Sequence, residues 1–118
     1  MRSALAEETV RERGEQGDGN AELMRLCCVQ LFNVGLLDDV LLIWDAKMAS
    51  FDTVSGLDIQ FLCGAGLPAT KAFLTAHAQV PEAEDALEYL SACEASGDFE
   101  DFTVQAWAAR YARYFGQE

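Results

Sequence analysis

From Ala21 onward, apolar residues recur at intervals of three and four positions, which is the period of an amphipathic helix. Asn20 can cap the start of the first such helix, and Gly35 supplies a residue suited to the left-handed turn that ends it. A second helix is expected over 36–48. Its apolar residues cover most of the helix circumference, so we expect it to be the most buried element.

A third helix is expected after Ser55, because Ser55 and Asp58 have the spacing of a capping box. The segment 57–61 also alternates between apolar and polar residues, as a strand does. A single strand would find no partner for its backbone polar groups, so the helix is the favoured interpretation. We expect this helix to end at the glycines of 64–66.

Three more helices complete the pattern. Pro68 and Pro81 stand where proline opens a helix, and Gly97 follows the apolar face of the fifth. The last helix has the clearest apolar stripe of the chain, made of Val104, Trp107, Ala108, Tyr111 and Phe115. The fold class predicted is therefore all-α, with about six helices.

The first twenty residues differ from the rest. They are polar, and three glycines fall between Gly14 and Gly19, where they raise the entropy cost of regular structure. We therefore expect a flexible N-terminal tail over 1–20 and a single all-helical domain over 21–118. Within the tail, Ser3 to Arg13 could form a fraying helix with a Glu7–Arg11 pair, but it has little apolar surface with which to dock. A chain of 118 residues buries roughly two-thirds of its unfolded surface, enough for a core without disulfides or metals.

Three glycines, Gly35, Gly66 and Gly97, lie 31 residues apart, and each follows an expected helix. A period of this length is typical of arrays of helix-turn-helix units. We expect three consecutive αα-hairpins in a solenoid-like bundle, at 21–49, 54–78 and 82–116. The alternative is that helix ends recur at helix-length spacing without any repeat.

The segment from Leu31 to Asp39, with sequence LFNVGLLDD, resembles the turn between paired helices in helical-repeat modules of the tetratricopeptide or HEAT-like kind. In outline the resemblance extends over 21–116, and the chain is also similar to small bacterial proteins. A module of this kind implies protein binding rather than chemistry.

The charge balance narrows the choice of partner. The chain has 20 acidic and 8 basic side chains, a net charge of −12. Nucleic acid and anionic membranes are disfavoured, because binding phosphates requires clustered lysine and arginine. A basic protein surface would instead be attracted.

We also expect a cytoplasmic protein with reduced thiols. The N-terminus lacks the apolar segment of a signal peptide, and the longest apolar run, 40–44, is far too short to cross a membrane. The four cysteines lie in apolar helical contexts, where cysteine serves as a small core residue.

Acidic residues gather near the C-terminus, since 9 of the 20 lie in the last 38 residues, against two basic ones. They form either a solvated face that keeps the protein soluble or a docking surface for a basic partner. Paired carboxylates for glycoside chemistry are a third option. Tyr114 falls off the apolar stripe, as an exposed interface tyrosine would. The candidate partner-binding residues are Glu84, Asp85, Glu88, Asp98, Glu100, Asp101 and Tyr114.

The prediction is a non-catalytic interaction module, comparable in size and charge with immunity proteins or inhibitors; a homodimer is also possible. The alternative is a small enzyme or ligand-binding bundle that uses His77, the single histidine, and a cysteine. No cysteine lies beside a base in the sequence, and no C-x-x-C or H-x-x-x-H pair marks a zinc site. We therefore predict no catalytic residue, metal or cofactor.

Overall fold

Helices account for nearly all of the regular structure. The computed structural model describes residues 2–14 and 20–116, and within these ranges it contains seven α-helices, two short 3₁₀ helices and no strand. The elements are α1 (Arg2–Gly14), α2 (Ala21–Val34), η1 (Leu37–Asp39), α3 (Val40–Lys47), α4 (Phe51–Gly56), η2 (Ile59–Cys63), α5 (Leu67–Ala76), α6 (Pro81–Ala95) and α7 (Val104–Tyr114). The all-α fold class is confirmed.

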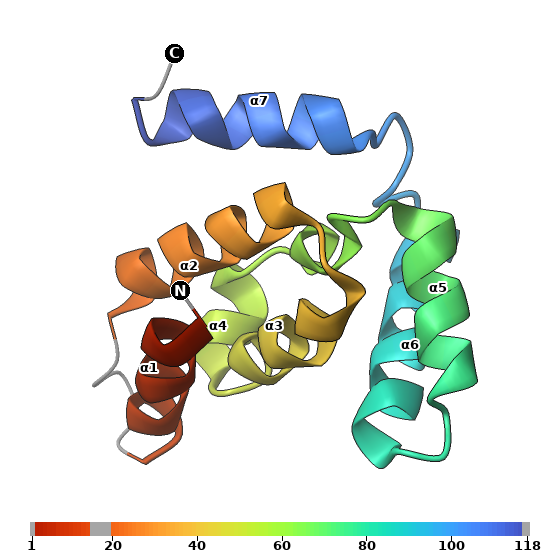
Figure 1. Cartoon of the computed structure of the whole chain (residues 1–118), viewed down its shortest axis with the longest axis horizontal. Helices are drawn as coiled ribbons and strands as arrows, with labels where there is room; N and C mark the ends of the chain where they lie inside the picture. Colours follow the sequence, from red (N-terminus) through yellow and green to blue (C-terminus); the bar gives the residue numbers. More distant parts are fainter. Residues whose placement is uncertain (1, 15–19, 117–118) are drawn as a thin grey trace.

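The helices form one packed body around α2, α3 and η2 (Figure 1). α1 packs against α2 and α3 on one side, and α5 and α6 lie side by side on the other. α7 crosses over α2 at the C-terminal end of the chain. The radius of gyration is 13.5 Å, the value expected for a single compact domain of this length. No helix in the described ranges is long and apolar enough to cross a bilayer.

The ends of α2 are those that the sequence predicts. The Asn20 side chain accepts a hydrogen bond from the backbone N–H of Leu23 at 3.0 Å. At the other end, Gly35 has φ +74° and its N–H donates to the carbonyl of Leu31. Position 64 also requires glycine, because the Cβ atom of any other residue would lie 2.3 Å from the carbonyl oxygen of Phe32. This close approach locks the end of η2 against the end of α2.

The N-terminal segment differs from the expected tail. Over Arg2–Gly14 it is a helix, α1, and its Leu5 is fully buried among the core residues. Arg2 pairs with the buried carboxylate of Asp39 through two hydrogen bonds, of 2.5 and 3.2 Å. Glu8 accepts a 2.7 Å hydrogen bond from the backbone N–H of Asn20. Polar contacts thus compensate for the few apolar residues of α1. The remaining residues of the expected tail, 1 and 15–19, lie outside the described ranges.

The capping box lies five residues earlier than predicted. Ser50 caps α4, its side chain accepting from the N–H of Thr53 while the Thr53 hydroxyl accepts from the N–H of Ser50. Ser55 instead lies inside α4, and Asp58 precedes η2 without making a side-chain cap. The single third helix predicted from Ser55 is therefore a short α-helix followed by a 3₁₀ helix.

The most extensive contacts between elements are those of α1 with α2 and with α3, followed equally by α3 with η2 and α5 with α6. α5 and α6 would belong to different hairpins in the predicted arrangement, so the order of pairing differs from the expectation. The remaining ends agree with the prediction: Pro68 and Pro81 lie in the first turns of α5 and α6, and Gly97 adopts φ +92° after α6.

Candidate functional site

The seven candidate residues fall at different places on the surface. Asp98, Glu100 and Asp101 lie on the connection between α6 and α7, where they line a groove of about 520 Å³ that we call the acidic groove. Its full lining is Asp58, Gln60, Asp98, Glu100, Asp101, Phe102, Thr103, Ala106, Trp107, Arg110 and Arg113.

The other predicted residues lie outside the acidic groove. Asp85 and Glu88 line a second groove, of about 470 Å³, between α3 and α6. Glu84 is an exposed residue of α6. Tyr114 lies near the C-terminal end of α7, against α2. The acidic candidates are thus divided between two grooves and the separate position of Glu84, and Tyr114 lies apart from them.

The turn before α7 shapes the acidic groove. Asp101 has φ +64°, a left-handed conformation that aspartate tolerates better than most side chains. Two residues later, the Thr103 hydroxyl accepts a 3.0 Å hydrogen bond from the N–H of Ala106 and caps α7. The turn therefore redirects the chain from α6 into α7 within a few residues (Figure 1) and leaves its carboxylates beside the first turn of α7.

Aromatic rings and one arginine form the other side of the groove. Trp107 contacts Phe102, with 6.1 Å between ring centroids, and the guanidinium of Arg110 lies 4.9 Å from the centre of the Trp107 ring. The indole N–H of Trp107 is buried and has no hydrogen-bond acceptor within the described ranges. This wall of the groove therefore already holds one guanidinium on an aromatic face, a favourable cation–π arrangement.

Carboxylates outnumber cations in the groove, four to two. Asp58 accepts a 2.7 Å hydrogen bond from Tyr111, and the backbone carbonyl of Asp98 accepts one from Gln60. The side chains of Glu100 and Asp101 are exposed and make no ion pair within the part of the chain that the structure describes. These two carboxylates are therefore free to pair with a cation from outside.

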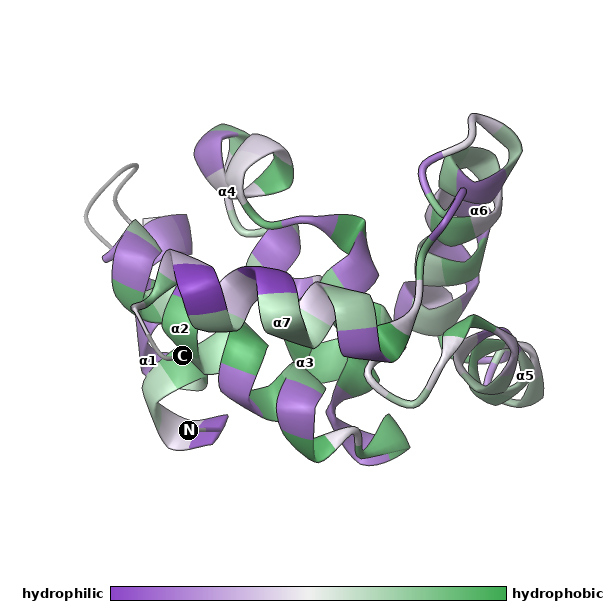
Figure 2. Ribbon diagram, turned by 90° about the horizontal axis from the view of Figure 1, so that it is seen from above, coloured by the Kyte–Doolittle hydropathy of each residue, from purple (hydrophilic) through white to green (hydrophobic). Residues whose placement is uncertain are grey.

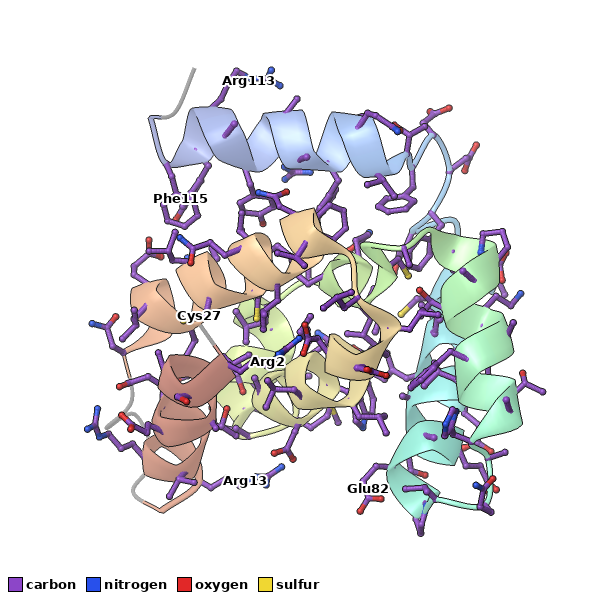
Figure 3. All side chains as sticks on the ribbon, in the orientation of Figure 1. Arg2, Arg13, Cys27, Glu82, Arg113 and Phe115 are labelled. Atoms are coloured by element: carbon purple, nitrogen blue, oxygen red, sulfur yellow. The ribbon has the colours of Figure 1, made fainter. Side chains whose placement is uncertain are left out.

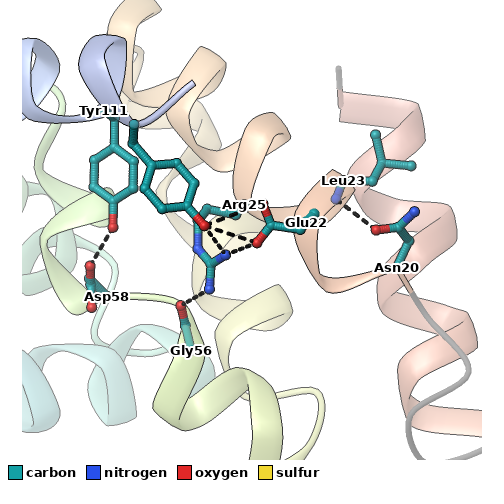
Figure 4. Close-up of polar contacts among 8 residues, drawn as sticks. Asn20, Glu22, Leu23, Arg25, Gly56, Asp58 and Tyr111 are labelled. Carbon is teal, nitrogen blue, oxygen red and sulfur yellow. Dashed lines mark hydrogen bonds and ion pairs between the residues drawn. The ribbon is translucent and has the colours of Figure 1, made fainter. Parts of the chain in front are cut away.

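A polar network fastens α7 to the rest of the protein (Figure 4). Arg25 of α2 pairs with Glu22 and donates to the carbonyl of Gly56 at 3.0 Å. Tyr114 is 54% exposed, yet its hydroxyl lies 3.1 Å from Arg25 and 3.2 Å from Glu22. Tyr114 thus joins two helices, a structural contact that its place off the apolar stripe did not indicate.

Asp58 and Arg25 were not among the candidates. Asp58 lies forty residues before Asp98 in the sequence, and its only signal there was a helix-cap pattern. The fold brings it to the groove because η2 packs beneath α7, with the ring of Phe61 5.0 Å from that of Tyr111.

No family model, no curated protein and no solved structure matches this chain. The interpretation of the two grooves therefore depends on their own geometry and charge.

The groove between α3 and α6 has a different character, with apolar walls and an acidic rim. Trp44 and Met48 come from α3 and the residue after it, and Tyr89 from α6; the Trp44 and Tyr89 rings meet edge to face, 5.5 Å apart. Asp85 and Glu88 are exposed at its border. We call it the aromatic groove.

The groups proposed for the catalytic alternative are engaged elsewhere. The His77 ring stacks on Phe73, and its Nδ1 lies 2.8 Å from the Phe73 carbonyl oxygen, which can only accept a hydrogen bond. Nδ1 therefore donates. This is the single hydrogen bond of the ring within the described ranges. The histidine thus closes the C-terminal end of α5.

None of the four cysteines, all within the described ranges, forms a disulfide there, and their surroundings disfavour the thiolate. Burial raises the pKa of Cys28 and that of Cys63 to about 12. Burial also raises the pKa of Cys27 and Cys93. Because the thiolate is the nucleophile, none of the four is activated by its environment. Within the described ranges, no group of three or more histidine, cysteine or acidic side chains is placed to hold a metal ion.

Proposed function

We propose that this protein is a non-catalytic interaction module that binds a basic protein partner through the acidic groove. The observation that carries the proposal is that two carboxylates without an ion pair in the described ranges, Glu100 and Asp101, line the same groove as the aromatic side chain of Trp107. Acidic side chains attract lysine and arginine, and aromatic side chains supply the apolar contact area that interfaces favour.

Charge supports the same partner over a longer range. A net charge of −12 on a body 38 × 33 × 25 Å in extent speeds the encounter with a basic surface at low ionic strength. An inhibitor or immunity protein that neutralises a basic protein is one form that this function takes.

The proposal has three further parts, which concern the cellular compartment, the origin of the fold and self-association. A cytoplasmic location is supported by the four cysteines, which form no disulfide within the described ranges, since reduced cysteines persist in that compartment. A solenoid-like origin from repeats of the tetratricopeptide or HEAT-like kind is a proposal supported by the 31-residue spacing of the glycines. A homodimer through Leu36 or Tyr114, which are 47% and 54% exposed, is an alternative use of the surface that sedimentation tests.

The proposal is tested by affinity capture from the cells that make this protein, at about 50 mM and about 300 mM salt, on either side of physiological screening. Three baits are compared: the unaltered protein, E100K/D101N, and the control E7K/E82Q. Both variants change the net charge by +3. Figure 3 shows Glu82 at the far end of α6 from the groove.

We expect the unaltered protein and the control to retain a basic protein at low salt and to release it at high salt. E100K/D101N should retain much less. Equal retention by all three baits would overturn the proposal, as would an empty capture at low salt.

A further inference from the structure

The aromatic groove combines two features that occur together where proteins bind cations with apolar stems. Its walls are Met48, Tyr89 and the small accessible part of Trp44, a side chain only 6% exposed, and its border carries Asp85 and Glu88, three residues apart on α6. Residues three apart on a helix lie on the same face, so both carboxylates point to one mouth. The volume of about 470 Å³ is within the range of small ligand sites, about 300–1,000 Å³.

The carboxylates at this mouth are unengaged. Neither Asp85 nor Glu88 makes a side-chain hydrogen bond or ion pair in the described ranges, whereas Glu94, farther along α6, pairs with Lys71 at 2.7 Å. Two unpaired carboxylates beside an apolar wall attract a cation from outside the protein.

One of the protein's own cations already contacts an aromatic ring of this groove. The ammonium of Lys47, which is almost fully buried, lies 5.3 Å from the centre of the Tyr89 ring and donates to two backbone carbonyls, of Val54 and Leu57. Since Tyr89 is engaged with Lys47, the apolar stem of an incoming side chain would lie mainly on Met48 and on the small accessible part of Trp44.

We propose that the aromatic groove receives an arginine side chain of the basic partner, with the guanidinium between Asp85 and Glu88 and the aliphatic stem on Trp44 and Met48. Arginine suits the site better than lysine, because its planar guanidinium both stacks on aromatic rings and pairs with two carboxylate oxygens at once. The inference depends on the proposed function, which supplies a basic partner, and adds a second anchoring point to it.

The two tryptophans allow a test that separates the grooves, since Trp44 lines the aromatic groove and Trp107 the acidic one. Protein labelled with 5-fluorotryptophan gives two ¹⁹F resonances, which W107F assigns. The probe is N-acetyl-arginine methylamide, and its neutral isostere, the citrulline analogue, is the control ligand.

We expect the arginine probe to shift the Trp44 resonance along a saturable curve, with a dissociation constant on the order of 10 mM for one side chain. The citrulline analogue should produce no saturable shift. D85N/E88Q should weaken binding of the arginine probe roughly tenfold, whereas E7Q/E82Q, with the same charge change at exposed positions that line neither groove, should leave it unchanged.

A Trp44 resonance that responds equally to both probes, or equally in both variants, would overturn the inference. That result leaves the proposed function standing if capture still depends on Glu100 and Asp101. Conversely, a Trp44 response without any groove-dependent capture retains the arginine site and rejects the proposed function.

Discussion

The phenol of Tyr111 donates a 2.7 Å hydrogen bond to Oδ2 of Asp58, so one carboxylate both lines the acidic groove and holds α7 in place. Burial raises the pKa of Tyr111, and the hydrogen bond to Asp58 raises it further. The phenol therefore remains protonated and keeps donating throughout the physiological pH range. The shape of the groove depends on this contact.

Replacing Tyr111 by phenylalanine should lower the free energy of unfolding by about 1–3 kcal/mol, the usual contribution of a partly buried hydrogen bond to a charged group. The ring and its contact with Phe61 remain. Urea denaturation measures the change. Y114F is the control, since this exposed hydroxyl should contribute less than about 1 kcal/mol. Equal losses for the two variants would contradict the structural role of Tyr111.

The lowered pKa of Lys47 makes the free energy of unfolding depend on pH, in a direction that follows from the shift. Burial lowers its pKa from the ordinary 10.5, so the folded protein releases this proton before the unfolded chain does. Between the lowered pKa and pH 10.5, the unfolded state binds more protons, and this group's contribution to stability rises with pH. The stability of the unaltered protein relative to K47M should therefore increase over this range. A constant or falling difference would contradict the assignment.

K47M should also be less stable at neutral pH. It leaves two backbone carbonyls without their 2.6 Å donors, at a cost of about 1–3 kcal/mol for each buried unpaired group, offset in part because no charge is then buried.

The thiols should react slowly in the folded protein. We expect iodoacetamide to alkylate each cysteine of the folded protein more slowly than it alkylates free cysteine at pH 8. The half-buried Cys93 should react first. Mass spectrometry measures the extent of alkylation at each cysteine over time. A cysteine that reacts faster than free cysteine would instead favour the catalytic alternative.

The same raised pKa values predict loss of stability at alkaline pH. Above pH 9 the unfolded thiols ionise while Cys28 and Cys63 stay protonated up to about pH 12. Because the unfolded chain then binds fewer protons than the folded protein, each of these two thiols lowers the free energy of unfolding by on the order of 1 kcal/mol per pH unit. C63A should be less sensitive to pH between 9 and 12 than the unaltered protein, and an equal slope would contradict the burial of this thiol.

Local signals in the sequence predicted several features of the fold, and tertiary contacts decided the others. Asn20 and Gly35 have the side-chain chemistry that helix ends require, so the bounds of α2 were predictable. The capping box was not, because Ser50 and Ser55 both have a polar residue three positions later, and only packing selects between them.

The docking of α1 on the core was not predicted, for a different reason. Hydrophobic periodicity detects apolar faces, whereas many positions of α1 are hydrophilic (Figure 2). Even so, α1 buries Glu8, Thr9 and Glu12 beside Leu5. These polar side chains are tolerated there because they form hydrogen bonds, such as that from Ser50 to Glu12 at 2.7 Å. The candidate site shows the same limit, since no local pattern could place Asp58 beside Asp98 and Glu100.

The docking of α1 leads to a further prediction. L5A removes a fully buried side chain and should lower the free energy of unfolding by about 2–5 kcal/mol, whereas V10A, at a position 70% exposed on the same helix, should change it by less than about 0.5 kcal/mol. Chemical denaturation followed by circular dichroism measures both. A flexible tail would instead make the two variants equally stable.

The central claim is that the acidic groove binds a basic partner, and the most direct measurement of it is the association rate with the captured protein as a function of salt. For the unaltered protein and E7K/E82Q, the rate should fall steeply as salt rises. E100K/D101N should associate several-fold more slowly at low salt and show a weaker salt dependence. Identical rates and identical salt dependence for the three proteins would contradict the account.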